Sequence, residues 1–284
     1  MTSETRIGPA LFAWGTRTFV MGILNVTPDS FSGDGLGRSA DMGAAAISRA
    51  RGMVDAGADL LDIGGESTRP GHAPVDEAEE LGRVVPVVRA IRAALPATPI
   101  TIDTTKPAVA EAALDAGADA INDVWGVNRA SALSRVAADR KVPIVLMHNR
   151  ETPVYDALVS EVIGDLRRAI DRALGAGVAE SGILIDPGIG FGKTAEQNIE
   201  LLGRLGELKA LNRPILLGTS RKSTLGKVLG GVPPEDRLEA TLATTALGVA
   251  AGIDIVRVHD VEPNVRAARM ADAIVRGGWQ EAST

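Results

Sequence analysis

The sequence predicts an α/β protein folded as a (β/α)8 TIM barrel with a short N-terminal hairpin. First, four segments share one order, in which an Ala-rich stretch with helical spacing is followed by an apolar run and then by polar residues. They begin at Asp55 (DAGADLLDIGG), Asp115 (DAGADAINDVWG), Gly175 (GAGVAESGILIDPGIG) and Ala250 (AAGIDIVRVHD). Second, the apolar runs are almost continuous, which is typical of strands buried on both faces of a parallel sheet. Third, eight such runs occur with no linker-like break, which favours a closed barrel over the alternative, a doubly wound open sheet.

Each predicted strand is a short apolar run, and several of them follow an Ala-Gly pair whose glycine suits the left-handed end of a helix. In chain order the eight strands are predicted at Phe19–Leu24, Leu60–Ile63, Pro99–Ile102, Ala120–Ile121, Pro143–Met147, Ile183–Ile185, Pro214–Leu217 and Ile253–Val258. The segment Ala10–Thr18 is predicted to form a small hairpin across the barrel floor. We therefore expect a single domain over residues 1–284, with the barrel proper at about 19–277.

The composition narrows the class of protein. The chain has 284 residues, 45% of them hydrophobic, with 30 Lys+Arg against 36 Asp+Glu and a net charge of −6. This balance argues against a nucleic-acid-binding protein. There is no cysteine, which excludes disulfides and thiol catalysis and suits the cytoplasm. Since neither a signal peptide nor a membrane-spanning run is evident, we expect a cytoplasmic protein with no membrane partner.

Polar residues gather where the predicted strands end. In a TIM barrel the carboxyl ends of the strands carry the chemistry. The residues at these ends are Asn25; Asp62, Glu66, Thr68 and Arg69; Asp103 and Lys106; Asn122 and Asp123; His148; Asp186; Ser220, Arg221, Lys222 and Ser223; and Arg257 and His259. This concentration predicts a binding site for a small molecule at the barrel mouth.

Three of these residues suggest what the site binds. Asp103, Asn122 and Asp186 follow three strands that face one mouth, where they would bind a flat heterocycle rich in N–H groups. Any one of them alone could be a turn former or a helix N-cap. Lys222 follows an apolar strand directly, which favours a site role over a solvated surface position.

A second set would bind an anion. Arg257 and His259 alternate with valines, so both side chains would point to one side of their strand. Together with Thr68 and Arg69 they would form a compact phosphate pocket, because guanidinium and hydroxyl groups match phosphate oxygens. The alternative for Arg257 and His259 is a structural ion pair. His148 could be either a ligand or a packed, hydrogen-bonded residue.

The stretch LIDPGIGFGKT, residues 184–194, resembles a nucleotide-binding P-loop but does not match it. A P-loop requires a glycine five residues before its Gly-Lys-Thr, and that position is Pro187. The stretch is predicted to deliver Asp186 from the sixth strand, and Lys193 and Thr194 are predicted only to begin the next helix.

Taken together, the motifs resemble the dihydropteroate synthase family, the folate-pathway enzymes that sulfonamide drugs inhibit. The segments that carry the resemblance are MGILNVTPDSFS (21–32), DIGGESTRPG (62–71), IDTTKPAV (102–109), INDVWG (121–126), LMH (146–148), LIDPGIGFGKT (184–194), GTSRKS (218–223) and IVRVHDV (255–261). They run in order from the first strand to the last, so the resemblance covers nearly the whole chain. It implies a pterin-binding TIM barrel and a transferase that joins 6-hydroxymethyl-7,8-dihydropterin diphosphate to 4-aminobenzoate, with Mg²⁺ assisting and diphosphate released.

The resemblance also implies a role for particular residues. The pterin ring is held by Asp103, Asn122, Asp186 and Lys222; the diphosphate by Thr68, Arg69, Arg257 and His259; and the 4-aminobenzoate by Phe31, Pro70, Phe191 and Ser223. Asn25 matches the position linked to Mg²⁺. The candidates for catalysis are Asp103, Asp186, Lys222 and Arg257, and a homodimer is expected.

Two points stay open at this level. The first loop reads Ser30-Phe-Ser-Gly-Asp-Gly35 where the family commonly has S-F-S-D-G-G, so the acidic residue that assists Mg²⁺ is not decided. The alternatives for function are a pterin-binding methyltransferase domain and a non-catalytic pterin-binding paralogue. Neither requires the residues expected to bind diphosphate, and their presence favours the synthase.

Overall fold

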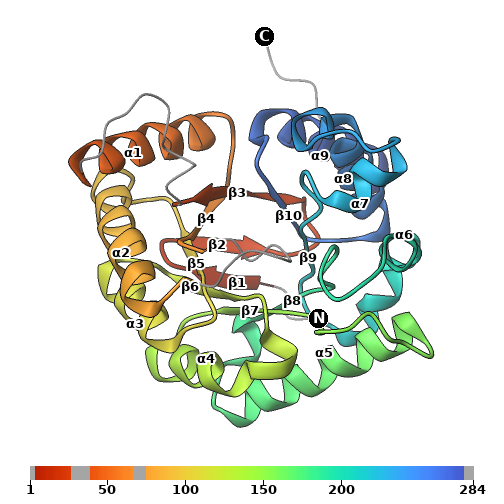
Figure 1. Cartoon of the computed structure of the whole chain (residues 1–284), viewed down its shortest axis with the longest axis horizontal. Coiled ribbons are helices and arrows are strands. Elements are labelled where there is room, and N and C mark those ends of the chain that lie inside the picture. Colours follow the sequence, from red (N-terminus) through yellow and green to blue (C-terminus); the bar gives the residue numbers. More distant parts are fainter. Residues whose placement is uncertain (1–3, 27–38, 67–74, 278–284) are drawn as a thin grey trace.

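The eight predicted strands form one parallel sheet. The computed structural model describes residues 4–26, 39–66 and 75–277. Its sheet strands are β3 (Phe19–Asn25), β4 (Leu60–Gly64), β5 (Ile100–Asp103), β6 (Ala120–Asp123), β7 (Ile144–Met147), β8 (Ile183–Asp186), β9 (Leu216–Leu217) and β10 (Ile255–Val258). They lie in the order β8-β7-β6-β5-β4-β3-β10-β9, and a parallel bridge between Ile185 and Ile215 joins the two end strands. The sheet is therefore a nearly closed barrel (Figure 1), which confirms the predicted fold class.

The helices surround the barrel (Figure 1). They are α1 (Ser39–Asp55), α2 (Glu77–Ala94), α3 (Pro107–Ala116), α4 (Gly126–Arg140), α5 (Leu158–Gly175), α6 (Ala195–Gly203), α7 (Ser223–Val228), α8 (Leu238–Ala251) and α9 (Val261–Val275), with short 3-10 turns η2 (Glu180–Gly182), η3 (Leu205–Leu211) and η4 (Pro234–Asp236). The repeated Ala-Gly pairs end helices as expected: Gly117 and Gly252 are the left-handed caps of α3 and α8, with φ of 115° and 86°. In the described ranges, no helix is both long enough and apolar enough to cross a membrane.

The strand boundaries differ from the prediction both where the strands begin and where they end. Three strands were expected to begin at proline, yet β5, β7 and β9 begin one or two residues later, because proline has no N–H to give to the ladder. The carbonyls of Pro99 and Pro143 still accept hydrogen bonds from neighbouring strands at 3.0 Å each. At the other end, residues predicted to follow the strands belong to them, because each still pairs with a neighbouring strand: Asp103 and Asp186 are the last residues of β5 and β8.

The barrel interior is apolar at one end and polar at the other. An apolar cluster fills the end where the strands begin, and it includes Leu60, Ala120, Leu184 and Ile255. Since residues two apart on a strand point to the same face, each of these positions is followed on the inward face by a polar residue. These polar residues are Asp62, Asn122, Asp186 and Arg257. The same alternation therefore produces the floor and the site above it.

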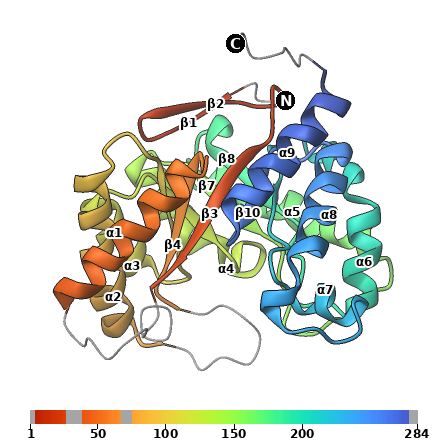
Figure 2. The ribbon, with the colours of Figure 1, turned by 90° about the horizontal axis from the view of Figure 1, so that it is seen from above.

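A hairpin covers the apolar end. Strands β1 (Glu4–Ile7) and β2 (Ala10–Ala13) pair antiparallel and lie across the end of the barrel where β3 starts (Figure 2). Phe12 stacks on Trp14 at a centroid distance of 5.5 Å and meets Phe19 edge-on at 4.8 Å. The hairpin thus confirms the predicted position, but it begins at Glu4 rather than at Ala10.

Phe12→Ala is expected to lower the free energy of unfolding by about 3–5 kcal/mol, because the substitution leaves a cavity under the barrel floor. Phe12 is 2% exposed, whereas its neighbour Leu11 is 49% exposed on the opposite face of the same strand. The matched control Leu11→Ala should change the same quantity by less than about 0.5 kcal/mol. Urea denaturation followed by circular dichroism measures both variants, and equal losses would contradict the role of the hairpin as a packed floor.

Candidate active site

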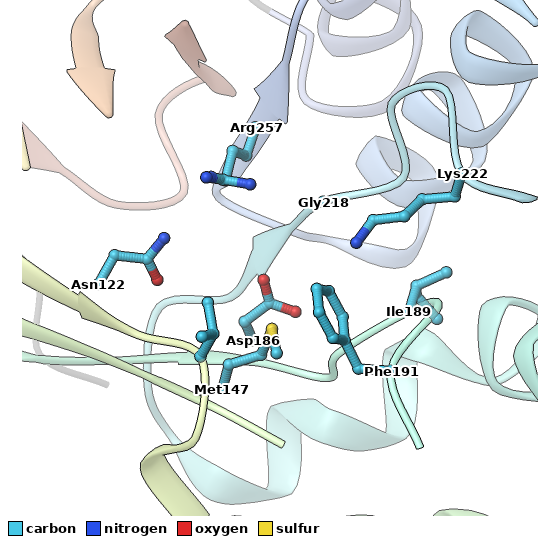
Figure 3. Close-up of a pocket in the computed structure, with 9 residues that line it drawn as sticks. Asn122, Met147, Asp186, Ile189, Phe191, Gly218, Lys222 and Arg257 are labelled. Carbon is cyan, nitrogen blue, oxygen red and sulfur yellow. The ribbon is translucent and has the colours of Figure 1, made fainter. Parts of the chain in front are cut away.

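A small pocket, about 270 Å³ when the open space at its mouth is included, lies at the carboxyl ends of the strands. Its lining comes from five strands and the loops that follow them: Asn122, Val124, Met147, Asp186, Ile189, Phe191, Gly218, Lys222 and Arg257. In Figure 3 the Asp186 carboxylate lies between Asn122 and Phe191, with Lys222 extending toward it and Arg257 above. The structure thus brings five of the sequence-predicted site residues into one pocket.

Asp186 lies at the centre of this pocket. It is the last residue of β8 and is 5% exposed. Its Oδ1 accepts a hydrogen bond from the backbone N–H of Gly188 at 2.6 Å. Burial raises the pKa of Asp186 to about 6, although the Gly188 N–H and the positive charges of Lys222 and Arg257 act to lower it. A ligand that brings N–H groups or positive charge to Asp186 would lower this pKa again and so favour the ionised carboxylate.

Arg257 is held by two buried carboxylates. Its Nε lies 2.5 Å from Asp62 Oδ2, and its Nη2 lies 2.6 Å from Asp103 Oδ2. Burial acts to lower the pKa of Arg257, but the charges of Asp62 and Asp103 outweigh burial and raise it. Burial also raises the pKa of Asp103 to about 7; Arg257 opposes this, while Asp62 and Glu80 add to it. The guanidinium group is thus a permanent positive charge at the mouth.

Asp62 holds pocket residues in place, a role that was not predicted for it from the sequence. It is completely buried and accepts hydrogen bonds from Asn122 Nδ2 at 3.2 Å and from the hydroxyl of Thr101. Through these bonds and the ion pair with Arg257, it orients two residues of the pocket. A signal was present in the sequence, because a carboxylate inside the apolar run LLDIG must find partners within the protein.

Lys222 and Phe191 form the side of the pocket opposite Asn122. Lys222 is the N-cap residue of α7, and its Nζ lies 3.7 Å from the centre of the Phe191 ring, a cation–π contact. Phe191 is 7% exposed and packs with Val124 and Met147. This apolar wall beside a cationic group suits a ligand that is aromatic and negatively charged.

The remaining predicted site residues lie around this pocket or outside the described residues. His259 follows β10, and its Nδ1 lies 3.0 Å from the hydroxyl of Ser220. Ser223 is exposed at the start of α7, and Asn25 ends β3, opposite Gly64 of β4. Four predicted residues lie outside the described residues: Phe31, Thr68, Arg69 and Pro70.

Two neighbours in the GFGKT motif have different roles. Thr194 begins α6 as predicted, since it forms a capping box with Gln197. The prediction that Lys193 likewise only begins the helix is wrong, because its ammonium group turns back to the loop before it and to His148. For His148 the packed alternative holds: it is completely buried and lies 3.1 Å from Asp165.

Asp62→Asn is expected to lower the pKa of Asp103, which burial raises to about 7, because a neighbouring negative charge is removed and Arg257 is left to pair with Asp103. Carbon-detected NMR titration of the Asp103 carboxyl group measures this change. The matched control is Asp59→Asn, which removes a carboxylate paired with Arg17 at the other end of the barrel. An unchanged titration of Asp103 in Asp62→Asn would show that the two carboxylates are not coupled.

Comparison with known proteins places this geometry in a family. The model of the family described as pterin binding enzyme matches residues 21–259. Among curated proteins, the dihydropteroate synthase of Clostridium beijerinckii is 49% identical over 95% of this chain and 99% of its own length. That of Bacillus subtilis is 47% identical over 95% of this chain and 93% of its own length.

Solved structures agree. Dihydropteroate synthase from Clostridium difficile, determined in the presence of pteroic acid, superposes with a TM-score of 0.89 at 51% identity and covers 93% of this chain and 99% of that chain. The enzyme from Xanthomonas albilineans with 4-aminobenzoic acid superposes with a TM-score of 0.90 at 41% identity and covers 96% of this chain and 98% of that chain.

Proposed function

The chain belongs to the pterin-binding enzyme family, with the dihydropteroate synthases, and from this premise we propose how its own residues divide the work of the reaction. The enzyme is a transferase of folate biosynthesis that joins 6-hydroxymethyl-7,8-dihydropterin diphosphate to 4-aminobenzoate and releases diphosphate. The observation that carries the assignment of roles is the convergence of carboxylate, amide, ammonium and guanidinium groups on one pocket.

The pterin ring is assigned to the depth of the barrel. Asp186 offers carboxylate oxygens to the N–H groups of the ring, and Asn122 offers both an acceptor and a donor beside it. Asp103 stands behind Arg257 on the same side of the barrel. The supporting observation is that Asn122 of β6 and Asp186 of β8 are nearly buried at the carboxyl ends of their strands and line one pocket, where a flat ring would be dehydrated on binding.

The diphosphate is assigned to the cationic side. Arg257 presents a guanidinium group that matches phosphate oxygens. His259 lies two residues further along the chain, directly after β10. Thr68 and Arg69 complete this proposed set from outside the described residues. Stabilising the leaving group in this way lowers the barrier to breaking the bond between the methylene carbon and oxygen.

Asn25 is proposed to hold Mg²⁺. Its side-chain carbonyl is a hard oxygen ligand at the mouth, and Mg²⁺ is commonly bound by one or two protein oxygens together with substrate phosphates. Among the described residues there is no cluster of three His, Cys, Asp or Glu side chains that could hold a metal. A single side-chain oxygen from Asn25 fits a metal that the substrate phosphates also bind. When bound, Mg²⁺ would neutralise charge on the departing diphosphate.

The arylamine is assigned to the rim, beside Phe191. The Phe191 ring and the apolar wall behind it would pack against the aromatic ring of 4-aminobenzoate, with Ser223 at the start of α7. Phe31 and Pro70, which lie outside the described residues, are proposed to join them. As diphosphate leaves, positive charge develops on the pterin methylene and ring, and the ionised forms of Asp103 and Asp186 stabilise it. The amine then attacks carbon, so positioning rather than a general base supports the reaction.

The direct experiment incubates the purified protein with Mg²⁺, the pterin diphosphate and 4-aminobenzoate. Formation of 7,8-dihydropteroate together with an equal amount of diphosphate is the expected result. Omitting 4-aminobenzoate or Mg²⁺ in turn provides the controls. The absence of both diphosphate release and a coupled product would overturn the assignment. Calorimetry with the pterin diphosphate would then test the non-catalytic binding alternative.

Assembly and location complete the proposal. A homodimer is supported by the large apolar side chains exposed on α8 and α9: Leu247 is 67% exposed, Met270 63% and Ile274 71%. Sedimentation velocity of the wild type and of Met270→Glu tests this, since a dimer built on this face would dissociate in the variant.

Because a charged diphosphate ester does not cross a bilayer unaided, the enzyme is assigned to the compartment that makes its substrate, the cytoplasm.

A further inference from the structure

A buried polar chain runs beside the pocket, from α5 to the loop after β8. His148, directly after β7, is completely buried. Its Nε2 lies 3.1 Å from Asp165 Oδ2, and its Nδ1 lies 2.9 Å from Lys193 Nζ. Burial lowers the pKa of His148 to about 4, so the imidazole is neutral at physiological pH. An ammonium group only donates hydrogen bonds; therefore Nδ1 accepts from Lys193, and Nε2 carries the proton that is donated to Asp165.

The Lys193 ammonium group has three donors and three acceptors around it. Besides His148 Nδ1, its Nζ donates to the carbonyl oxygens of Gly188 and Phe191, each at 3.1 Å. The same Gly188 carbonyl accepts from the N–H of Phe191 at 3.2 Å, which closes the turn. Lys193 therefore fixes both ends of the turn 188–191.

This turn carries two groups of the pocket. At its start, the Gly188 N–H binds the carboxylate of Asp186, and at its end Phe191 presents its ring to Lys222. The loop after β7 also supports the turn closely: Gly188 has φ of +69°, and a Cβ on it would lie 1.8 Å from the carbonyl oxygen of His148. Only glycine fits at this point of contact between the two loops, and Lys193 also bridges them through its bonds to His148 and Gly188.

We propose that Lys193 is a positioning residue for the arylamine: its ammonium group fixes the turn 188–191 and so holds Phe191 where 4-aminobenzoate packs. This rests on the proposed function, and it assigns to the lysine of GFGKT a task unrelated to phosphate. Asp186 depends less on Lys193, because strand β8 also holds it.

The test is Lys193→Met, which keeps the aliphatic stem and removes the donors. We expect the KM for 4-aminobenzoate to rise about 10-fold or more, since two hydrogen bonds to the turn are lost. The kcat and the Kd for pterin diphosphate, measured by calorimetry, should change less than about 3-fold. The matched control is Lys227→Met, an exposed lysine on α7, which should leave all three quantities unchanged. A KM for 4-aminobenzoate equal to that of the wild type would overturn the proposal.

A double-mutant cycle separates positioning from general destabilisation. If Lys193 acts through Phe191, then Lys193→Met should add almost nothing to the KM for 4-aminobenzoate in a Phe191→Ala background. Additive effects of the two substitutions would count against the proposal. If the wild type itself had no activity, the proposed function would be refuted. That outcome differs from an unchanged KM in Lys193→Met, which would refute only the role of Lys193.

The charge on Lys193 gives a second readout. Burial lowers the pKa of Lys193 to about 7; Arg150 and Lys222 act in the same direction, and Asp186 and Asp165 oppose it. The KM of the wild type for 4-aminobenzoate should therefore rise as the pH increases through about 7, where the lysine loses one donor. The rise should be absent from Lys193→Met, and an identical pH profile in both proteins would contradict the proposal.

Discussion

Arg257→Ala is expected to lower kcat/KM for the pterin diphosphate by about 10³-fold, comparable with removing a main donor to developing negative charge. Arg257 is nearly buried at the barrel mouth and is paired with Asp62 and Asp103. The substitution removes the cation assigned to the diphosphate and leaves two carboxylates facing it unbalanced. Binding of 6-hydroxymethylpterin, which has no diphosphate, should weaken far less than binding of the diphosphate ester.

Steady-state kinetics and calorimetry on the folded fraction measure both effects. Arg17→Ala is the matched control, because Arg17 also forms a two-bond pair with a carboxylate, Asp59, at the opposite end of the barrel. It should leave kcat/KM within about 2-fold of the wild type. A loss below about 10-fold in Arg257→Ala, or an equal loss for the free pterin, would remove Arg257 from the diphosphate site.

Asp186→Asn is expected to weaken pterin binding about 100-fold, because two hydrogen bonds to a charged acceptor are replaced by one neutral bond and one mismatched N–H. The amide oxygen can still accept the bond from the Gly188 N–H, so the loop should keep its position. Calorimetry with 6-hydroxymethylpterin measures the loss. Unchanged affinity would mean that the ring is held elsewhere.

The same variant should be at least as stable as the wild type at neutral pH. Burial raises the pKa of Asp186 from 3.8 to about 6, so the folded protein binds this proton more tightly than the unfolded chain. The contribution of Asp186 to stability is therefore most favourable below about pH 4 and declines as the pH rises toward 6. Asn does not titrate, and its stability advantage over Asp should grow across this interval. Urea denaturation of both proteins at several pH values tests the sign.

The architecture could be predicted because its causes are local. An Ala-Gly pair followed by an apolar run specifies where a helix ends and a buried strand begins, and Gly117 and Gly252 take the left-handed conformation that this reading requires. Four such units among eight apolar runs, with no linker-like break, leave few alternatives to a barrel. Strand ends were placed less well, since whether Asp103 is the last residue of a strand or the first of a loop depends on a partner strand, which a local pattern does not include.

The contacts between loops could not be predicted in the same way. Lys193 finds His148, 45 residues earlier, only because β7 and β8 are neighbours and their loops leave the barrel side by side. No local pattern distinguishes this lysine from one that begins a helix. Asp62 differs, because the alternation of Leu60 and Asp62 on one face already indicated an inward-pointing carboxylate. Its place at the mouth was predicted, but its bonds to Asn122 and Arg257 were not, because they depend on strands far away in the sequence.

In the described part of the chain, the packed hairpin closes the end of the barrel where the strands begin. Phe12 and Trp14 pack in the floor beneath the hairpin, which lies across the end where the strands begin (Figure 2). With the sites assigned above, substrates would enter and products would leave at the end where the strands finish. The pterin, assigned to Asn122 and Asp186, would lie deeper than the arylamine beside Phe191. An arylamine bound first would block the way to the deeper site, so the pterin has to bind first. The coupled product would then leave through the same end of the barrel by which the substrates entered. Steady-state kinetics should accordingly be ordered, with an excess of 4-aminobenzoate slowing the arrival of the pterin diphosphate.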